Sequence, residues 1–162
     1  MNYVVVDKRL ATVSVLDGRG KLLGTSPVLL GAAVGDDSAP GIGTRPMAQV
    51  LPHERTTPAG RFLAEPGHNA KGEDIVWVDY DTAVSFHRVR VANPSDRRLQ
   101  RLATSTANDN RISYGCINVP VDFYNNVLRP AMTESGAVVY VLPETRSWQQ
   151  VFWPSKTNVL LQ

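Results

Sequence analysis

Residues 113–118 read Ser113-Tyr114-Gly115-Cys116-Ile117-Asn118 and contain the only cysteine of the 162-residue chain. The polar residues before this stretch, 108–111, favour a loop, and the residues after it, 119–124, indicate the start of a helix. We therefore place Cys116 at a loop-to-helix junction, where backbone N–H groups can activate a thiol and stabilise an oxyanion. The alternative is a small buried apolar residue, which is the usual role of an isolated cysteine.

Two upstream segments accompany this stretch. Residues 56–62 read Thr56-Thr57-Pro58-Ala59-Gly60-Arg61-Phe62, and Phe86-His87-Arg88 lies at the end of an apolar segment. In this order the three segments resemble the motifs of the L,D-transpeptidase catalytic domain (the YkuD family). Those motifs are a T-P-x-G-x-F segment, a catalytic histidine, and a signature of Ser or Thr, His, Gly, Cys, an apolar residue and Asn. The resemblance covers roughly residues 3–143.

The resemblance implies that Cys116 is the nucleophile, His87 its base and Ser113 a third catalytic residue. A thiol is mostly protonated at neutral pH, so an imidazole that takes its proton assists acyl transfer. Without the resemblance, His87 would equally fit a structural histidine. Further residues are expected to contact the substrate or its oxyanion, namely Tyr114, Gly115, Asn118, Arg88 and Arg111.

The chain departs from the family pattern at two points. Tyr114 stands where the signature has histidine, and the 25 residues between His87 and Ser113 imply an insertion beside the active site. A phenol cannot replace imidazole as a base at neutral pH. We therefore expect Tyr114 to shape or polarise the acyl site, with packing alone as the alternative.

Arginines are concentrated in and around this insertion. Guanidinium groups bind carboxylates bidentately, so these arginines offer a means of selecting diaminopimelate-containing stem peptides by their free carboxylates. A solvated helix face is the alternative. The arginines are Arg88, Arg90, Arg97, Arg98, Arg101 and Arg111.

The activity that the resemblance implies is transpeptidation of peptidoglycan stem peptides, with a donor stem held as a thioester on Cys116 and an acceptor stem supplying the amine. The altered signature favours crosslinks at a non-standard stem position, and acylation by a carbapenem is expected. One alternative is an L,D-carboxypeptidase or amidase-type hydrolase of the same fold. The other is a non-catalytic module that binds the cell wall.

Composition narrows the class of protein. With 43% hydrophobic and 20% charged residues, the chain fits one soluble folded domain with a sizeable core. A net charge of +2 is too small to indicate a nucleic-acid partner. A single cysteine and three scattered histidines, His53, His68 and His87, give neither a disulfide nor zinc spacing, so we expect no metal and no cofactor.

Targeting features are expected to be absent from this chain. Its first residues lack a basic start followed by a long apolar run, and no stretch approaches 18 apolar residues, so we expect neither an export signal nor a membrane span. The resemblance nevertheless implies a periplasmic or cell-wall-associated protein. The sequence leaves the oligomeric state open.

The predicted fold is mainly β, a sandwich-like domain with two short helices and a long Pro/Gly-rich loop over 35–58. The loop is either a functional cover or a surface excursion. A hairpin turn at 17–20 joins the second and third predicted strands. Strands are expected over 3–6, 10–16, 21–31, 62–64, 74–80, 83–89 and 136–142.

The two helices are predicted over 97–102, with Ser95 as N-cap, and over 121–131. Residues 1–143 form the expected catalytic domain, and residues 144–162 a C-terminal extension packed on it. The aromatic residues of that extension, Trp148, Phe152 and Trp153, are expected to cover an edge of the core.

Overall fold

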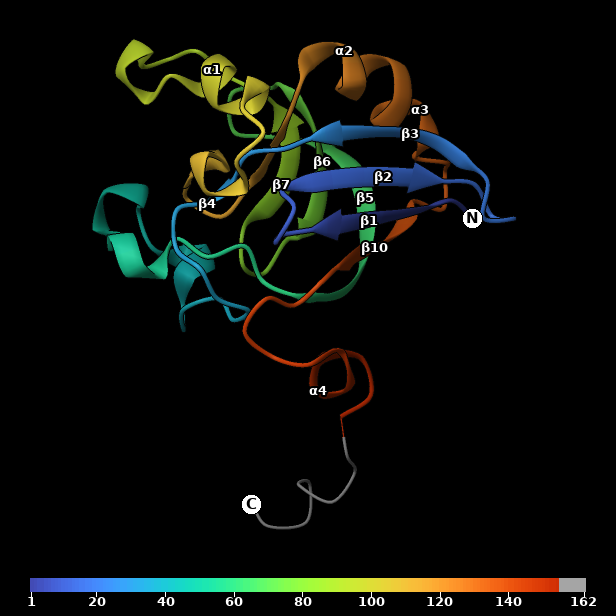
Figure 1. Ribbon diagram of the computed structural model, residues 1–162, viewed down its shortest axis with the longest axis horizontal. Helices are drawn as coiled ribbons and strands as arrows, with labels where there is room; N and C mark the ends of the chain where they lie inside the picture. The colour runs from blue at the N-terminus through green and yellow to red at the C-terminus, as the bar shows by residue number, and fades with distance from the viewer. Residues whose placement is uncertain (155–162) are drawn as a thin grey trace.

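The computed structural model describes residues 1–154, and its centre is a strongly curved sheet of eight strands (Figure 1). The order across this sheet is β3-β2-β1-β10-β5-β6-β7-β9. Its strands are β1 (Tyr3–Asp7), β2 (Thr12–Leu16), β3 (Leu22–Pro27), β5 (Gly60–His68), β6 (Asp74–Asp79), β7 (Val84–Arg88), β9 (Ile117–Val119) and β10 (Ala137–Val141). A second, two-stranded sheet pairs β4 (Leu30–Gly31) with β8 (Arg111–Ser113).

Alternation of side chains explains the first strands. In β1 and β2, the valines at 4, 6, 13 and 15 are fully buried, whereas the residues between them are partly exposed. Such branched side chains pack well on a pleated surface with one buried face. The predicted hairpin between β2 and β3 is confirmed, and Asp17 Oδ1 closes its turn by accepting from the N–H groups of Arg19 and Lys21, both at 2.9 Å.

Helices are short and lie outside the sheet. The predicted helix over 121–131 is confirmed as a continuous helical segment made of α2 (Val121–Phe123), the π-helical turn η6 (Tyr124–Leu128) and α3 (Arg129–Ala131). Its residues Phe123, Tyr124 and Leu128 belong to the same core cluster as the valines of β1 and β2. A third helix, α4 (Trp148–Phe152), was not predicted; its Phe152 ring stacks edge-on against Tyr140, with ring centroids 5.9 Å apart.

The helix of the insertion is α1 (Arg98–Ala103), close to the predicted 97–102, but its predicted cap is wrong. Asn93, not Ser95, is the capping side chain, and its Oδ1 accepts from Ser95 N at 3.1 Å. That bond caps a separate 3-10 turn, η4 (Pro94–Asp96). Arg97 then takes a left-handed conformation, with φ 52°, so that α1 starts in a new direction.

The predicted Pro/Gly-rich loop contains no extended ladder. It holds three 3-10 turns, η1 (Ile42–Thr44), η2 (Met47–Gln49) and η3 (Pro52–Glu54), and one isolated bridge from Ala33 to Thr56. Residues 155–162 of the predicted C-terminal extension lie outside the described residues. Within residues 1–154, no helix is long and apolar enough to cross a membrane.

The prediction that Cys116 lies at a loop-to-helix junction is wrong. Cys116 lies between β8 and β9, and the helical segment starts five residues later, at Val121. The residues that follow it, Ile117–Val119, are buried and pair in parallel with β7, with His87 opposite Asn118. A helix terminus therefore makes no contribution at the thiol, and the β7–β9 pairing positions it instead.

A buried ionic cluster connects the N-terminal strand, the long loop and the segment after β10. The Lys8 ammonium is fully buried and donates to Asp36 Oδ1 at 2.9 Å and to the Thr57 carbonyl at 2.8 Å. Asp36 also accepts from the backbone N–H groups of Glu144 and Arg146. These hydrogen bonds outweigh desolvation and hold the pKa of Asp36 well below its usual value of 3.8.

Replacing Asp36 by Asn should strongly destabilise the fold, because the buried Lys8 ammonium loses the carboxylate at 2.9 Å and keeps only the Glu144 carboxylate at 3.6 Å. We expect Asp36→Asn to lower the free energy of unfolding by about 3 to 5 kcal/mol at pH 7. The matched control is Asp37→Asn. The Asp37 carboxylate forms an exposed pair with Arg146, so its replacement should lower the free energy of unfolding by less than about 1 kcal/mol. Chemical denaturation measures both; equal effects would contradict the buried cluster's role.

Because the pKa of Asp36 is depressed in the folded state, its contribution to stability is present above its unfolded pKa and is lost as pH falls. The free energy of unfolding of the unaltered protein should therefore start to fall below about pH 4. Asp36→Asn should flatten that acid limb relative to Asp37→Asn.

Candidate active site

Cys116 faces the start of strand β7. Its half-buried thiol lies 3.5 Å from the Ala83 carbonyl, to which the S–H donates, and the Ser85 hydroxyl donates to Sγ across 3.6 Å. A hydroxyl that donates to sulfur can stabilise negative charge there. Ser85 was not identified from the sequence, and the only available signal was its position two residues before His87 in a predicted strand.

Two hydroxyl groups fix the backbone of the turn before Cys116. Ser113 Oγ donates to the Cys116 carbonyl at 2.6 Å and accepts from Gly115 N at 3.1 Å. Thr57 Oγ1 donates to the Gly115 carbonyl at 2.7 Å and accepts from Gly31 N at 3.0 Å. Thr57 belongs to the 56–62 segment, so the structure brings together two of the three segments singled out in the sequence.

Gly115 is required by both conformation and space. Its φ of +136° lies in a region that side-chain-bearing residues rarely adopt, and a Cβ there would lie 2.9 Å from the Thr56 carbonyl oxygen. The glycine therefore lets the nucleophile's turn approach the 56–57 backbone.

His87 lies in β7 and is only 6% exposed. Its Nδ1 is 2.8 Å from the Arg88 carbonyl, and because a carbonyl only accepts, Nδ1 carries the proton. Burial is the main cause that lowers the His87 pKa to about 4; the charges of Arg90 and Arg98 act in the same direction. At neutral pH the ring is therefore uncharged, and Nε2 carries the lone pair.

Asn118 connects this base to the insertion. Its Oδ1 accepts from Arg98 Nη1 at 2.7 Å, and its Nδ2 lies 3.4 Å from His87 Nε2. A guanidinium only donates, so the amide oxygen must face Arg98 and the amide N–H must face His87. Each group therefore donates to the next: Arg98 donates to Asn118, Asn118 to His87 Nε2, and His87 Nδ1 to the Arg88 carbonyl.

One face of the β7–β9 ladder collects the reactive groups. Side chains alternate along a strand, so Ser85 and His87 share a face of β7, and Cys116 and Asn118 share the same face next to β9. Within residues 1–154, no hydrogen bond joins the Cys116 thiol directly to His87. The thiol and the base occupy neighbouring positions on that face.

Tyr114 is held by a cation rather than by a hydrogen bond. The Arg55 guanidinium lies over its ring, 4.0 Å from the centroid. Arg55 is also part of the long loop, since its NH2 group donates to the Val50 carbonyl at 3.3 Å. Tyr114 therefore joins the nucleophile's turn to the Pro/Gly-rich loop.

The structure does not bring Arg88 or Arg111 to Cys116. Arg88 points away from the face that carries His87, where it pairs with Asp74 at 2.8 Å and lies over the Tyr124 ring. Arg111 pairs with Glu144 in the buried ionic cluster. Both guanidinium groups pair with carboxylates that are distant in sequence. Those pairs are not visible in the local sequence, so both arginines looked available for a substrate. Arg98 is the arginine that reaches the site.

No side-chain cluster of the described residues offers a metal site: residues 1–154 contain no group of three or more His, Cys, Asp or Glu arranged to hold an ion.

No protein-family model and no curated protein matches the sequence. Solved structures do match in shape. An L,D-transpeptidase from Mycobacterium smegmatis superposes with a TM-score of 0.51 at 19% identity, over 87% of this chain and 58% of that chain. The LD transpeptidase LdtMt1 in complex with imipenem superposes with a TM-score of 0.52 at 19% identity, over 87% and 58%.

The fold is that of the L,D-transpeptidase catalytic domains. The helical cell shape determining protein Pgp2 from Campylobacter jejuni has the same fold, with a TM-score of 0.57 at 13% identity over 90% of this chain and 48% of that one. This chain thus spans about half the length of these proteins. The predicted fold class, mainly β with short helices, is confirmed.

Gly115→Ala should destabilise the L,D-transpeptidase-like fold more than Gly72→Ala, although both glycines have a positive φ. Gly72→Ala meets open space at φ +82° and should cost about 1 to 2 kcal/mol. Gly115→Ala has the same kind of strain and also the contact with Thr56, so we expect a loss at least about 1 kcal/mol larger. Thermal and chemical unfolding of both variants measure this difference; equal losses would contradict the close approach.

Proposed function

We propose that this chain is a cysteine L,D-transpeptidase that acts on peptidoglycan stem peptides through a thioester on Cys116. The observation that carries the proposal is the shared face of β7 and β9, on which a thiol and a neutral, oriented imidazole lie together. The fold it shares with L,D-transpeptidases supports the substrate class. The proposed location is accordingly the periplasm or the cell wall.

The acylation step uses His87 first as base and then as acid. The Asn118 amide, 3.4 Å from His87 Nε2, moves off this nitrogen when the substrate binds. His87 Nε2 then takes the thiol proton while Sγ attacks the carbonyl carbon between an L-centre and the terminal D-residue of the donor stem. The tetrahedral intermediate collapses, the C–N bond breaks, and the proton on Nε2 passes to the leaving amine. A thioester remains on Cys116, and His87 returns to its neutral state.

The oxyanion needs a donor that is free in the resting state. Gly115 N already donates to Ser113 Oγ, whereas the Cys116 N–H has no hydrogen-bond partner within residues 1–154. Cys116 N is therefore the backbone donor that we assign to the oxyanion. Ser113 then acts by holding the turn, since its hydroxyl bonds only to the backbone of residues 115 and 116.

Deacylation decides the product. An amine of the acceptor stem attacks the thioester, transfers its proton to His87 Nε2, and releases the Cys116 thiolate, which gives a crosslink. Water in place of the amine gives the L,D-carboxypeptidase reaction. The replacement of the signature histidine by Tyr114, held under Arg55, is the feature that supports a non-standard crosslink position.

Intact-mass spectrometry with imipenem, and separately with a tetrapeptide donor, tests the thioester chemistry. The wild-type protein should form a single covalent adduct, and Cys116→Ala should form none. His87→Gln should slow acylation by about 10²- to 10⁴-fold, because the base is lost. His53→Gln changes an exposed histidine of the long loop and should acylate at the wild-type rate.

Absence of a wild-type adduct, with wild type and Cys116→Ala binding cell wall equally, would contradict the proposal and favour the wall-binding module. Addition of an acceptor amine to the acylated protein separates transfer from hydrolysis by the mass of the product. Fragmentation of that product identifies the crosslinked stem position; only conventional third-to-third links would contradict the non-standard position.

A further inference from the structure

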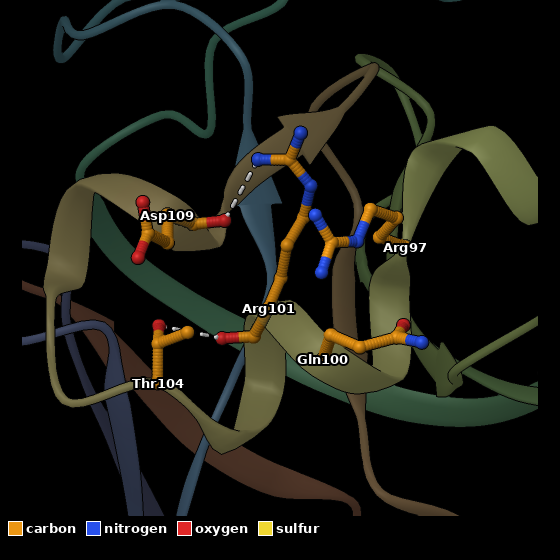
Figure 2. A pocket seen from close by; sticks show the side chains of 5 residues that line it. All are labelled: Arg97, Gln100, Arg101, Thr104 and Asp109. Carbon is orange, nitrogen blue, oxygen red and sulfur yellow. Dashed lines mark hydrogen bonds between the residues drawn. The ribbon is translucent and has the colours of Figure 1, made fainter.

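A cavity of about 220 Å³ lies on the insertion, apart from the residues around Cys116 (Figure 2). Four of its five lining residues come from α1 and its two flanking positions, and the fifth comes from the 3-10 turn η5 (Ala107–Asn110). The lining residues are Arg97, Gln100, Arg101, Thr104 and Asp109.

Two guanidinium groups line this cavity, and neither is paired with a carboxylate within residues 1–154. Arg101 is held in place by carbonyl groups, since its Nε donates to Asp96 O at 2.6 Å and its Nη1 to Asp109 O at 3.0 Å. The Arg97 side chain is exposed and has no hydrogen-bond or ion-pair partner within residues 1–154. Asp109 contributes its carbonyl, and its carboxylate forms no ion pair with either arginine among the described residues.

Such an arrangement suits an anion, because the Arg101 guanidinium is already held in place by the Asp96 and Asp109 carbonyl groups. Two neighbouring positive charges repel each other, and an anion between them removes that repulsion. Planar guanidinium groups match the two oxygens of a carboxylate, and the Gln100 amide and Thr104 hydroxyl offer further polar contacts. Asp109 adds a negative charge to the lining, which favours a singly charged ligand over a phosphate dianion.

The same helix connects the cavity to the reaction face. Arg98 lies between the cavity residues Arg97 and Arg101 in sequence, but its side chain extends to Asn118, which faces His87. A group bound in the cavity is therefore held by the element that also orients the base. This is the insertion that separates His87 from Ser113.

We propose that this cavity binds a free carboxylate of the peptide substrate. The insertion is then a substrate-recognition element, with Arg97 and Arg101 as the carboxylate-binding residues in place of Arg88 and Arg111. The peptide nature of the ligand rests on the proposed function; the preference for a carboxylate rests on the cavity itself.

Calorimetric binding without turnover tests this inference. The probes are a diaminopimelate-containing tripeptide with free carboxylates and the same tripeptide with every carboxylate converted to a carboxamide. The wild-type protein should bind the acid roughly tenfold more tightly than the amide. Arg97→Gln should reduce that preference several-fold, and the double variant Arg97→Gln, Arg101→Gln should abolish it.

Two comparisons keep the result interpretable. Arg19→Gln removes an exposed arginine from the β2–β3 turn and should keep the full acid preference. Arg97→Gln removes no contact within the described residues, so its effect does not depend on the fold surviving the loss of Arg101. The same measurement with a tetrapeptide donor in acid and amide forms shows which substrate supplies the carboxylate.

Equal affinity of the wild-type protein for acid and amide, or a preference that survives in both arginine variants, would overturn the inference. A wild-type imipenem adduct without acid preference would overturn it while leaving the proposed function standing. Acid preference without any adduct would keep the carboxylate site and remove the thioester chemistry.

Discussion

The parallel pairing of β7 with β9 places His87 opposite Asn118 and Ser85 beside Cys116, and the candidate site depends on this register. A shift by one residue would move the thiol and the imidazole to opposite faces of the sheet, because side chains alternate along each strand. Ile117 and Val119 are fully buried on the other face, so the hydrophobic core opposes such a shift. The geometry of the site is therefore fixed by packing on the opposite face of the same strand.

A second set of contacts fixes the nucleophile's turn against the body of the domain. The buried Lys8 ammonium donates to the Thr57 carbonyl, and the Thr57 hydroxyl donates to the Gly115 carbonyl. Arg111, at the start of β8, pairs with Glu144 in the same ionic cluster. The charges that stabilise the fold are thus in contact with the segment that presents Cys116, which couples the stability of the domain to the precision of the site.

Local patterns in the sequence predicted what depends on local structure. β-Branched and aliphatic residues predicted β1 and β2, the apolar run 136–142 predicted β10, and the turn residues 17–20 predicted the first hairpin. The short strand β9 was missed, because Ile117-Asn118-Val119 becomes a strand only by pairing with β7, some thirty residues away. The roles of the arginines were equally hidden: Asp74 and Glu144 engage Arg88 and Arg111, and nothing local distinguishes Arg98 from its neighbours.

The donor chain from Arg98 through Asn118 holds His87 as a neutral imidazole with its proton on Nδ1. ¹⁵N-detected NMR of the imidazole nitrogens measures this directly. We predict a protonated Nδ1 and an unprotonated Nε2 at pH 7, with the ring becoming charged only near its pKa of about 4. A proton on Nε2 at pH 7, or a ring that titrates near 6.5, would contradict it.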